Sequence, residues 1–335
     1  MYKLNRPIQL GILGCGSFIQ RRILPILKTI DVLSIVALQK RNLFEAKQIA
    51  EKYNIPHAVS TRDELLKLPQ VEAVLIATPN HMHEQDALAC ASYLKPTLCE
   101  KPLAPSASAI EKMIKAFQKQ DLPLYVGQSL RFKFCLQKAK QLLQSGRLGQ
   151  LLSIRAHFSI PLHKDNWRHR KAQGGGVLQD IGVHLIDLIR FISGQEIYSI
   201  FSQANHDYQI AAPEAEQTVT AICRLTDQSI SSFECSFTHP FSSGFEVIGN
   251  KARLVSNDSL RQSDNSNETF CLIENDTKSY LPIPLSNIYF DELIHFVDSI
   301  QGSPSIISAE EGLQNQKVID AAYHSIQKGS YIQVR

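Results

Sequence analysis

The sequence predicts an α/β protein in which a doubly wound parallel sheet is followed by a second α/β domain with an open, mostly antiparallel sheet. Three observations support this fold class. Apolar strand-like runs alternate with helical segments in the first part of the chain, shorter strand candidates separated by turn residues follow, and 335 residues are enough for two hydrophobic cores. We therefore expect two domains, residues 1–126 and 127–335.

The first domain repeats one order of elements several times. Apolar runs at 8–13 and 33–38 each lead into a helical segment, and the second of these helices ends before Pro56. The stretch VEAVLIATPNHMHEQDALACASYL gives the same order of strand, turn and helix, and LKPTLCEKPLA and LPLYVGQ supply two more strands. Strands that are apolar throughout and alternate with helices are typical of a parallel sheet covered on both faces.

A glycine pair lies where the first strand turns into a helix. Gly14 and Gly16 are spaced as in the Rossmann fingerprint, in which backbone amides and the helix N-terminus hold a pyrophosphate. The third small residue of that fingerprint is replaced by Ile19, and an ordinary tight turn remains an alternative explanation. On the cofactor interpretation the loop contacts are Gly14, Cys15, Gly16, Ser17, Phe18 and Ile19.

The end of the second strand bears on cofactor choice. NAD-binding folds place a carboxylate there to accept hydrogen bonds from the adenosine ribose, whereas this chain has Lys40 and Arg41 and no acidic residue until Glu45. Two cations suit a 2′-phosphate, so the sequence favours NADP(H), with NAD(H) as the alternative. A pair of solvated surface charges would give the same sequence.

The stretch GGGVLQDIGVHLIDLIRFI, residues 174–192, predicts a buried helix with one polar stripe. Asp180, His184 and Asp187 share a narrow sector, and most other positions are apolar. Such a stripe must face a cavity or buried partners. We expect Asp187 to pair with a backbone group or an arginine, and the three glycines at 174–176 to bring the backbone close to a ligand.

Composition excludes several classes of partner. The net charge is +3 without a basic block, so we expect small-molecule partners and no nucleic acid. No apolar run is long enough to span a bilayer and no secretory signal is evident, which predicts a cytoplasmic protein without membrane contact. The seven scattered cysteines predict reduced core thiols, and no metal-ligand cluster is apparent.

Three motifs in this order resemble the glucose-fructose oxidoreductase and inositol dehydrogenase family (Gfo/Idh/MocA): TPNHMH at 78–83, CEKPLA at 99–104 and GGGVLQDIGVHLIDLIR at 174–190. SGRLGQL at 145–151 and AEEGLQNQKVIDAAYHS near the C-terminus extend the resemblance. Ile19 and the missing carboxylate near Lys40 depart from the family pattern and bear on cofactor choice. The resemblance implies a Rossmann domain and a second domain whose sheet forms a homodimer or homotetramer interface.

The resemblance implies that Lys101, Asp180 and His184 are catalytic. A lysine at the end of a strand can stabilise oxyanion character on the reacting oxygen, and an imidazole can carry the proton in either direction. Asp180, one turn before His184, would orient it or share the substrate hydroxyl. A solvated lysine and a satisfied core histidine are the alternatives for each residue taken alone.

The same resemblance assigns further contacts. Asn80 and His83 are expected near the nicotinamide, although Asn80 after Pro79 would also serve as a helix N-cap. Trp167 and Arg168 are expected to wall the substrate site, with an exposed basic loop as the alternative. The remaining assigned residues are Thr78, Pro79, Glu100 and Lys101 for the cofactor and Arg131 for the substrate.

The sequence thus predicts an NAD(P)-dependent oxidoreductase that acts on a secondary alcohol, or its ketone, in a sugar, sugar nucleotide or cyclitol. A glycosidase of the same family that uses a retained nicotinamide is one alternative. A regulatory protein that senses dinucleotides and has lost catalysis is another. Lys101, Asp180 and His184 together favour an enzyme, because a sensor needs no proton carrier.

Overall fold

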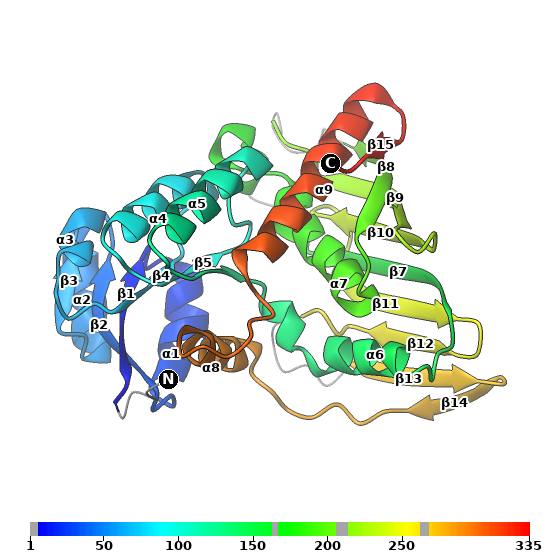
Figure 1. Ribbon diagram of the computed structural model, residues 1–335, viewed down its shortest axis with the longest axis horizontal. Coiled ribbons are helices and arrows are strands. Elements are labelled where there is room, and N and C mark those ends of the chain that lie inside the picture. Colours follow the sequence, from blue (N-terminus) through cyan, green and yellow to red (C-terminus); the bar gives the residue numbers. More distant parts are fainter. Residues whose placement is uncertain (1–5, 163–166, 206–213, 262–267) are drawn as a thin grey trace. The chain divides into compact units, whose positions relative to one another are not determined.

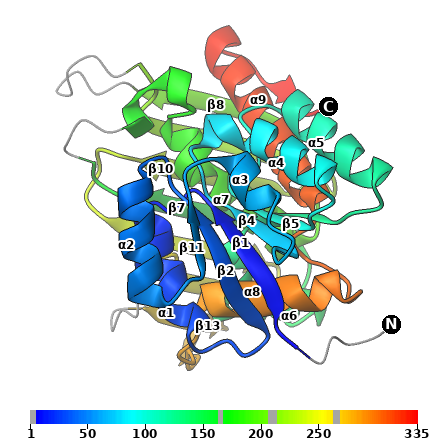
Figure 2. The ribbon, with the colours of Figure 1, turned by 90° about the vertical axis from the view of Figure 1, so that its left-hand side faces the viewer.

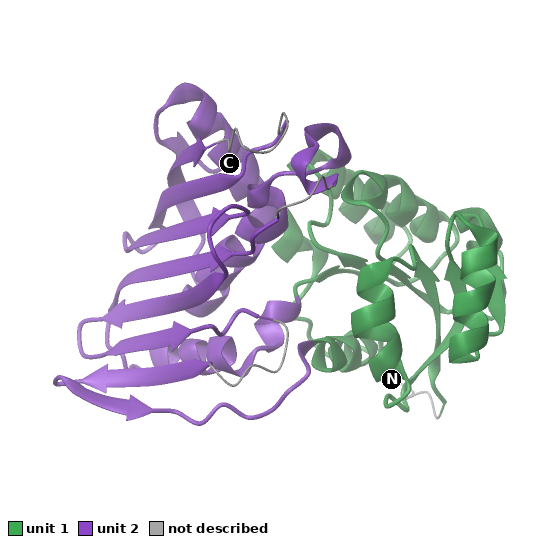
Figure 3. Cartoon of the chain, turned by 180° about the vertical axis from the view of Figure 1, so that it is seen from behind, with its two compact units in different colours: residues 1–128, 289–313 green, residues 129–288, 314–335 purple. Residues whose placement is uncertain are grey.

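The computed structural model describes residues 6–162, 167–205, 214–261 and 268–335. The chain forms two compact units, shown in Figure 3. The first runs through Gln128 and includes residues 289–313, and the second contains residues 129–288 and 314–335. The first break, after Gln128, lies close to the expected boundary after residue 126. Residues 289–313 were expected in the second domain but belong to the first unit.

The first unit is built on a six-stranded parallel sheet in the order β3-β2-β1-β4-β5-β6. Figure 2 shows α1 and α2 on one side of β1 and β2, and α3 and α4 on the other. This confirms the doubly wound fold. The strands are β1 (Ile8–Leu13), β2 (Leu33–Gln39), β3 (His57–Val59), β4 (Ala73–Ile76), β5 (Thr97–Glu100) and β6 (Leu124–Gly127). Its helices are α1 (Leu24–Leu27), α2 (Leu43–Tyr53), α3 (Arg62–Leu66), α4 (His83–Ser92), α5 (Ala107–Lys119) and α8 (Ile288–Ile300).

Local sequence explains where these elements begin. The Asn42 side chain accepts hydrogen bonds from two amides of α2, Thr61 and Glu64 form a capping box at α3, and Ser106 caps α5. All four residues of β4 are buried, as expected for a central parallel strand, and the four residues of the edge strand β6 are buried as well. The chain therefore turns from strand to helix at the carboxyl ends of the strands, where doubly wound sheets bind ligands.

Helix α8 joins the first unit through aromatic packing. Phe296 is fully buried and meets the Tyr125 ring edge-on, with the ring centroids 5.7 Å apart. Tyr125 also forms a β-bridge with Ser308, and the Val126 amide donates to the Ile307 carbonyl at 2.9 Å. Apolar contact and backbone pairing together hold this distant segment against β6.

The second unit contains a nine-stranded mixed sheet, in which β7 and β10 are parallel and the other neighbours are antiparallel. The open, mostly antiparallel sheet is thus confirmed, and Figure 1 shows its strands fanned beside α6 and α7. Its order is β14-β13-β12-β11-β7-β10-β9-β8-β15. The strands are β7 (Leu151–Ser159), β8 (Ile197–Asn205), β9 (Thr218–Leu225), β10 (Ile230–Ser236), β11 (Ser242–Gly249), β12 (Arg253–Asn257), β13 (Thr269–Glu274), β14 (Thr277–Tyr280) and β15 (Ile332–Gln333). Its helices are α6 (Phe134–Gln144), α7 (Val183–Ser193) and most of α9 (Ala309–Lys328).

All seven cysteines lie among the described residues, where they are buried and unpaired. Burial raises the pKa of the Cys90 and Cys223 thiols to about 12, so they are packing residues and not nucleophiles. This confirms the expected core thiols. No helix in the described ranges has both the length and the apolar content that a membrane span requires.

If α8 is part of the first core, replacing Phe296 with Ala should cost about 3–5 kcal/mol of unfolding free energy, because the fully buried ring leaves a cavity. The control is Leu285→Ala, whose side chain is 91% exposed and should change stability by less than about 0.5 kcal/mol. Urea unfolding followed by circular dichroism measures both. Equal stability of the two variants would contradict this packing.

Candidate active site

The glycine pair forms a tight turn at the end of β1. Gly14 has φ +87°, and a Cβ there would lie 2.5 Å from the Thr78 amide nitrogen, so only glycine fits. At Gly16 an added Cβ would meet no protein atom within 4 Å. The cradle thus has one glycine required by the protein and a second that opens onto free space, which fits a backbone-bound pyrophosphate.

The residue that replaces the third small residue of the fingerprint is part of the core. Ile19 is fully buried and begins a π-helical turn, Ile19–Ile23, ahead of α1. Phe18 packs edge-on against Tyr289 of α8, with the ring centroids 5.3 Å apart. Of the assigned loop residues, Cys15 and Ile19 are therefore buried, while Ser17 is exposed.

The two cations after β2 point in different directions. Lys40 Nζ lies 3.1 Å from Glu45 Oε2 and donates to the Cys15 carbonyl at 3.5 Å, so it turns back over the glycine loop. Arg41 instead lines a cavity of about 260 Å³ together with Gln39, Thr61 and Arg62. This cavity is formed by the carboxyl ends of β2, β3 and β4, where a doubly wound fold holds an adenosine.

The turns after β4 and β5 are tied together by His83. Its ring is buried, with Nδ1 2.9 Å from the Pro102 carbonyl oxygen and Nε2 2.8 Å from that of Thr78. Burial lowers the pKa of His83 and the two carbonyls oppose this, because a neutral ring can donate to only one of them. The structure thus gives this predicted cofactor contact two backbone partners, one of them next to Lys101, whose peptide bond to Pro102 is cis.

Two carboxyl groups interact at the EKP motif of the first unit, and of these Glu292 is buried and Glu100 is half-buried. The Lys101 amide donates to Glu100 Oε2 at 3.3 Å. Burial raises the pKa of Glu100 to about 7, opposed by the positive charge of Lys101. Burial, and then the charge of Glu100, raises the pKa of Glu292 on α8 well above its usual range. Two interacting carboxyls of this kind titrate together, so they need not both carry charge at neutral pH.

In the second unit the glycine triplet is crowded by protein. A Cβ on Gly175 would lie 2.5 Å from the Arg168 carbonyl oxygen, and one on Gly176, which has φ +122°, would lie 2.5 Å from Glu216 Oε1. Glu216 Oε1 also accepts from the Leu178 amide and the Tyr323 hydroxyl, both at 3.0 Å. Gly175 and Gly176 are therefore required by close packing of the protein on itself, a reason different from the expected approach of a ligand.

The helix after the triplet begins as a π-turn, Leu178–Gly182, and continues as α7. Every residue from Val183 to Ile192 is buried, as predicted. Asp180 Oδ2 accepts from Arg168 Nε at 2.7 Å, and the Arg168 guanidinium lies 4.7 Å from the Trp167 ring centroid. His184 is 4% exposed beside the Phe158 ring. The structure thus brings together Trp167, Arg168 and Asp180.

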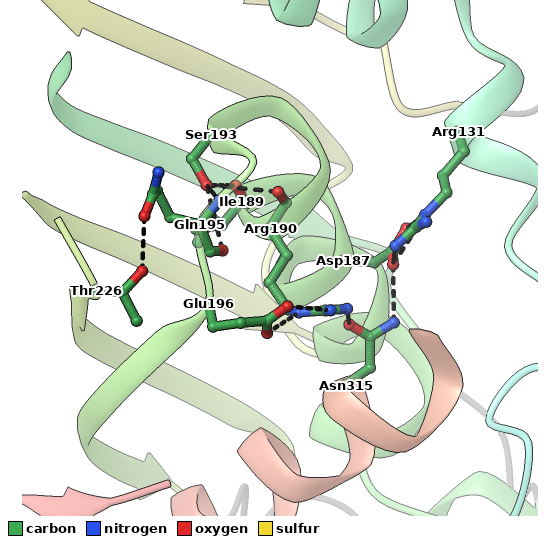
Figure 4. A network of polar contacts seen from close by, with 9 residues as sticks. All are labelled: Arg131, Asp187, Ile189, Arg190, Ser193, Gln195, Glu196, Thr226 and Asn315. Carbon is green, nitrogen blue, oxygen red and sulfur yellow. Dashed lines mark hydrogen bonds and ion pairs between the residues drawn. The ribbon is translucent and has the colours of Figure 1, made fainter. Parts of the chain in front are cut away.

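Asp187 completes the polar stripe and is fully paired (Figure 4). Arg131 donates to it through Nε at 2.9 Å and Nη2 at 2.6 Å, and Asn315 Nδ2 donates at 2.8 Å. Burial alone would raise the pKa of Asp187, but Arg131 and Asn315 outweigh burial and hold it below its usual value. Asp187 therefore has the arginine partner that was expected. That partner is Arg131, which was expected to bind substrate.

Asn315 also links this ion pair to a second one. Its Oδ1 accepts from Arg190 Nη1 at 2.8 Å, while Arg190 Nε and Nη2 both donate to Glu196 at 2.7 Å. An amide suits this position because its NH₂ faces a carboxylate and its oxygen faces a guanidinium. The network joins α7 and α9 (Figure 4).

Sequence reasoning did not find Arg62, Glu216, Glu292 or Asn315. The capping box at Thr61 would have placed Arg62 at the start of a helix after β3, and Asn315 lies in the quoted C-terminal motif. Glu216 and Glu292 carry no local signal, because only the fold shows that they are buried. Within the described ranges no three His, Cys, Asp or Glu side chains are grouped so as to hold a metal ion.

The doubly wound parallel sheet with its glycine turn is the architecture of a dinucleotide-binding Rossmann unit, and a second unit with a mostly antiparallel sheet accompanies it. Two family models match the chain: the oxidoreductase family with NAD-binding Rossmann fold at residues 8–128, and the GFO/IDH/MocA C-terminal domain at residues 136–255. The chain belongs to the Gfo/Idh/MocA family, and it is a dehydrogenase or reductase of that family.

Individual relatives are distant but extend over most of the chain. It is 26% identical to the myo-inositol 2-dehydrogenase of Thermotoga maritima, over 91% of this chain and 92% of that protein. It is 28% identical to the 1,5-anhydro-D-fructose reductase of Ensifer adhaerens, over 80% and 81%. The structure resembles that of an aldose-aldose oxidoreductase from Caulobacter crescentus complexed with glycerol, with TM-score 0.92, 23% identity and coverage of 98% and 100%.

The two glycines of the first loop should separate stability from cofactor binding. Gly14→Ala should cost about 1–3 kcal/mol, because of its positive φ and the clash with Thr78. Gly16→Ala should keep the parent stability within about 0.5 kcal/mol but weaken NAD(P)H binding, since its methyl enters the open cradle. Urea unfolding and fluorescence titration test this. Unchanged affinity in Gly16→Ala would place the pyrophosphate elsewhere.

Asp187→Asn should cost about 3–5 kcal/mol at pH 7, because it leaves the buried Arg131 without its anion. The folded pKa of Asp187 is depressed, so its contribution is present above the unfolded pKa of about 3.9 and is lost as pH falls through the folded pKa. The difference between parent and variant should therefore shrink in acid. Urea unfolding between neutral and acidic pH, with exposed Glu51→Gln as control, measures it, and a pH-independent difference would contradict this account.

Proposed function

We propose that the chain catalyses hydride transfer between a nicotinamide cofactor and a secondary alcohol, or the corresponding ketone, of a sugar, sugar nucleotide or cyclitol. The observation that carries the proposal is the pair Asp180 and His184, which lies on a buried, mostly apolar helix whose other charged residues, Asp187 and Arg190, are paired within the protein. The activities of the inositol and anhydrofructose relatives support the substrate class.

Each of three residues has one task in this proposal. A bound nicotinamide supplies the hydride acceptor or donor. Lys101 donates a hydrogen bond to the reacting oxygen and stabilises its developing negative charge. His184 takes the hydroxyl proton during oxidation and returns it during reduction. Asp180, held by Arg168, orients His184 and the substrate hydroxyl.

Other assigned residues divide between binding and support. We infer that Trp167 and Arg168 contact the substrate, and that Thr78, Pro79, Asn80 and Glu100 border the cofactor. The Arg131 guanidinium donates to Asp187, and the residue is 3% exposed. These contacts support a role in positioning α7 and not in direct contact with the substrate. His83, held by two carbonyls, supports the Lys101 turn in the same way.

We further propose that the enzyme prefers NADP(H) and forms a homodimer or homotetramer through the nine-stranded sheet. Cofactor preference is supported by Arg41, which follows β2, and by the lack of a carboxylate at that point. Assembly is supported by apolar side chains on one sheet face, where Ile222 is 43% and Ile230 is 51% exposed. Size-exclusion chromatography with light scattering tests the assembly.

The test of function begins with a thermal-shift screen of the full chain against NAD, NADH, NADP and NADPH. Oxidation assays on a panel of inositols, hexoses and other polyols follow, with the cofactor that stabilises most. Turnover with a polyol supports the proposal. Glycosidic bond cleavage without net cofactor turnover would favour the glycosidase alternative, and a cofactor response without any turnover would favour a sensor.

Lys101→Met should lower the rate of hydride transfer by about 10²-fold or more while fold and cofactor binding persist, because the cation acts on the developing oxyanion. His184→Ala should cause a fall of roughly 10²-fold and remove one limb of the pH-rate profile, and Asp180→Asn should impair turnover through orientation. Steady-state kinetics across pH measures these effects. Parent-like rates in Lys101→Met, or an unchanged profile in both other variants, would exclude these roles.

A further inference from the structure

We propose that Arg62 and Arg41 together bind the 2′-phosphate of NADP(H), and that Lys40 serves the glycine loop instead. This inference rests on the proposed function, because it names the residues through which the same site selects its cofactor. Lys40 and Arg41 are neighbours in the sequence. In the structure, however, the second cation at the Arg41 cavity is Arg62, which follows β3.

Lys40 is already engaged elsewhere. Its Nζ lies 3.1 Å from Glu45 Oε2 and 3.5 Å from the Cys15 carbonyl oxygen, and its side chain is 24% exposed. The contact with Cys15 directs its ammonium group toward the glycine loop. Lys40 does not line the cavity that Arg41 lines.

Arg41 and Arg62 reach the same cavity from two neighbouring strand ends. Arg41 follows β2 and Arg62 begins α3 after β3, and the Lys40 amide joins the two ends by donating to the Val59 carbonyl at 3.2 Å. Within the described part of the chain Arg41 makes no ion pair with a carboxylate. Arg62 shares its charge with Asp63 and Asp86, and the two arginines together still offer several guanidinium donors to a phosphate at this cavity.

Arg62 is fixed in place before any ligand binds. Its Nη1 donates to Asp86 Oδ1 and to the Gln85 carbonyl, both at 3.2 Å, and its Nε donates to Asp63 at 3.3 Å. Asp86 is buried, and its Oδ2 accepts from the Thr78 hydroxyl at 2.7 Å. A preorganised guanidinium loses little conformational entropy on binding an anion.

The residues after β2 argue against recognition of an unmodified ribose. Among the residues that line the cavity, all of which are described, Asp86 is the one carboxylate. Arg62 uses one of its oxygens and Thr78 the other. Asp86 thus serves Arg62 and Thr78, and the two residues that directly follow β2, where NAD-selective sites place a carboxylate for the ribose diol, are the cations Lys40 and Arg41.

The experiment measures binding of two nucleotide probes, adenosine 2′,5′-bisphosphate and 5′-AMP, to the full chain by calorimetry. The parent should prefer the 2′-phosphate. Arg41→Ala and Arg62→Ala should each lower that preference about tenfold or more, the effect of losing a charge-assisted hydrogen bond, and leave 5′-AMP affinity nearly unchanged. Arg62→Gln, which keeps a hydrogen bond to Asp86, guards against misfolding. The matched control, Lys40→Ala, should leave the ratio of the two affinities unchanged.

The outcomes separate this inference from the cofactor preference and from the activity. A parent preference that is lost in Lys40→Ala but kept in Arg62→Ala and Arg62→Gln would overturn the inference while NADP(H) selection stands. Equal binding of both probes by the parent would overturn both the inference and the cofactor preference. Equal loss of both probes in Arg62→Gln, with the fold intact, would assign Arg62 to the adenine and overturn its phosphate role. Turnover on a polyol is measured independently of all three results.

Discussion

The buried carboxylate of Asp187 is the constraint on which much of the second unit depends. A charge in the middle of an apolar helix is tolerated only if it is paired and its remaining lone pairs are satisfied. Arg131 supplies the charge, and Asn315 supplies a further donor while it also accepts from Arg190. The hydrogen bonds to the Asp187 carboxylate thus join three segments: the chain before α6, helix α7 and helix α9. They hold in position the helix that carries His184.

Close approach of backbone segments is the second constraint, and it acts in both units. Gly14 allows the ends of β1 and β4 to meet, and Gly175 and Gly176 allow the chain around Arg168 and the Glu216 carboxylate to pack against the start of the buried helix. In both motifs, therefore, close packing of the protein on itself explains why glycine is required next to predicted catalytic or cofactor-binding residues. Gly16 is different, because the space beside it is open.

Local signals predicted the parts of the fold and site that depend on local chemistry. The strand-helix alternation, the turn at Gly14 and the buried helix with its polar stripe are all present. The return of residues 289–313 to the first unit gave no such signal, because helix α8 has an ordinary apolar pattern and its partner Tyr125 lies far away in sequence. The fold class was predictable from the sequence, but the partner of each polar side chain was not.

The sequence by itself determined the two kinds of sheet, the glycine turn, the EKP segment and the spacing of Asp180, His184 and Asp187, because each follows from periodicity or from the conformational limits of a few adjacent residues. The tertiary structure decided that Lys40 turns to Glu45, that Arg62 joins Arg41 and that Arg131 holds Asp187. These pairings form between side chains from separate elements. Charge and burial select among such partners only after the chain has brought those elements together.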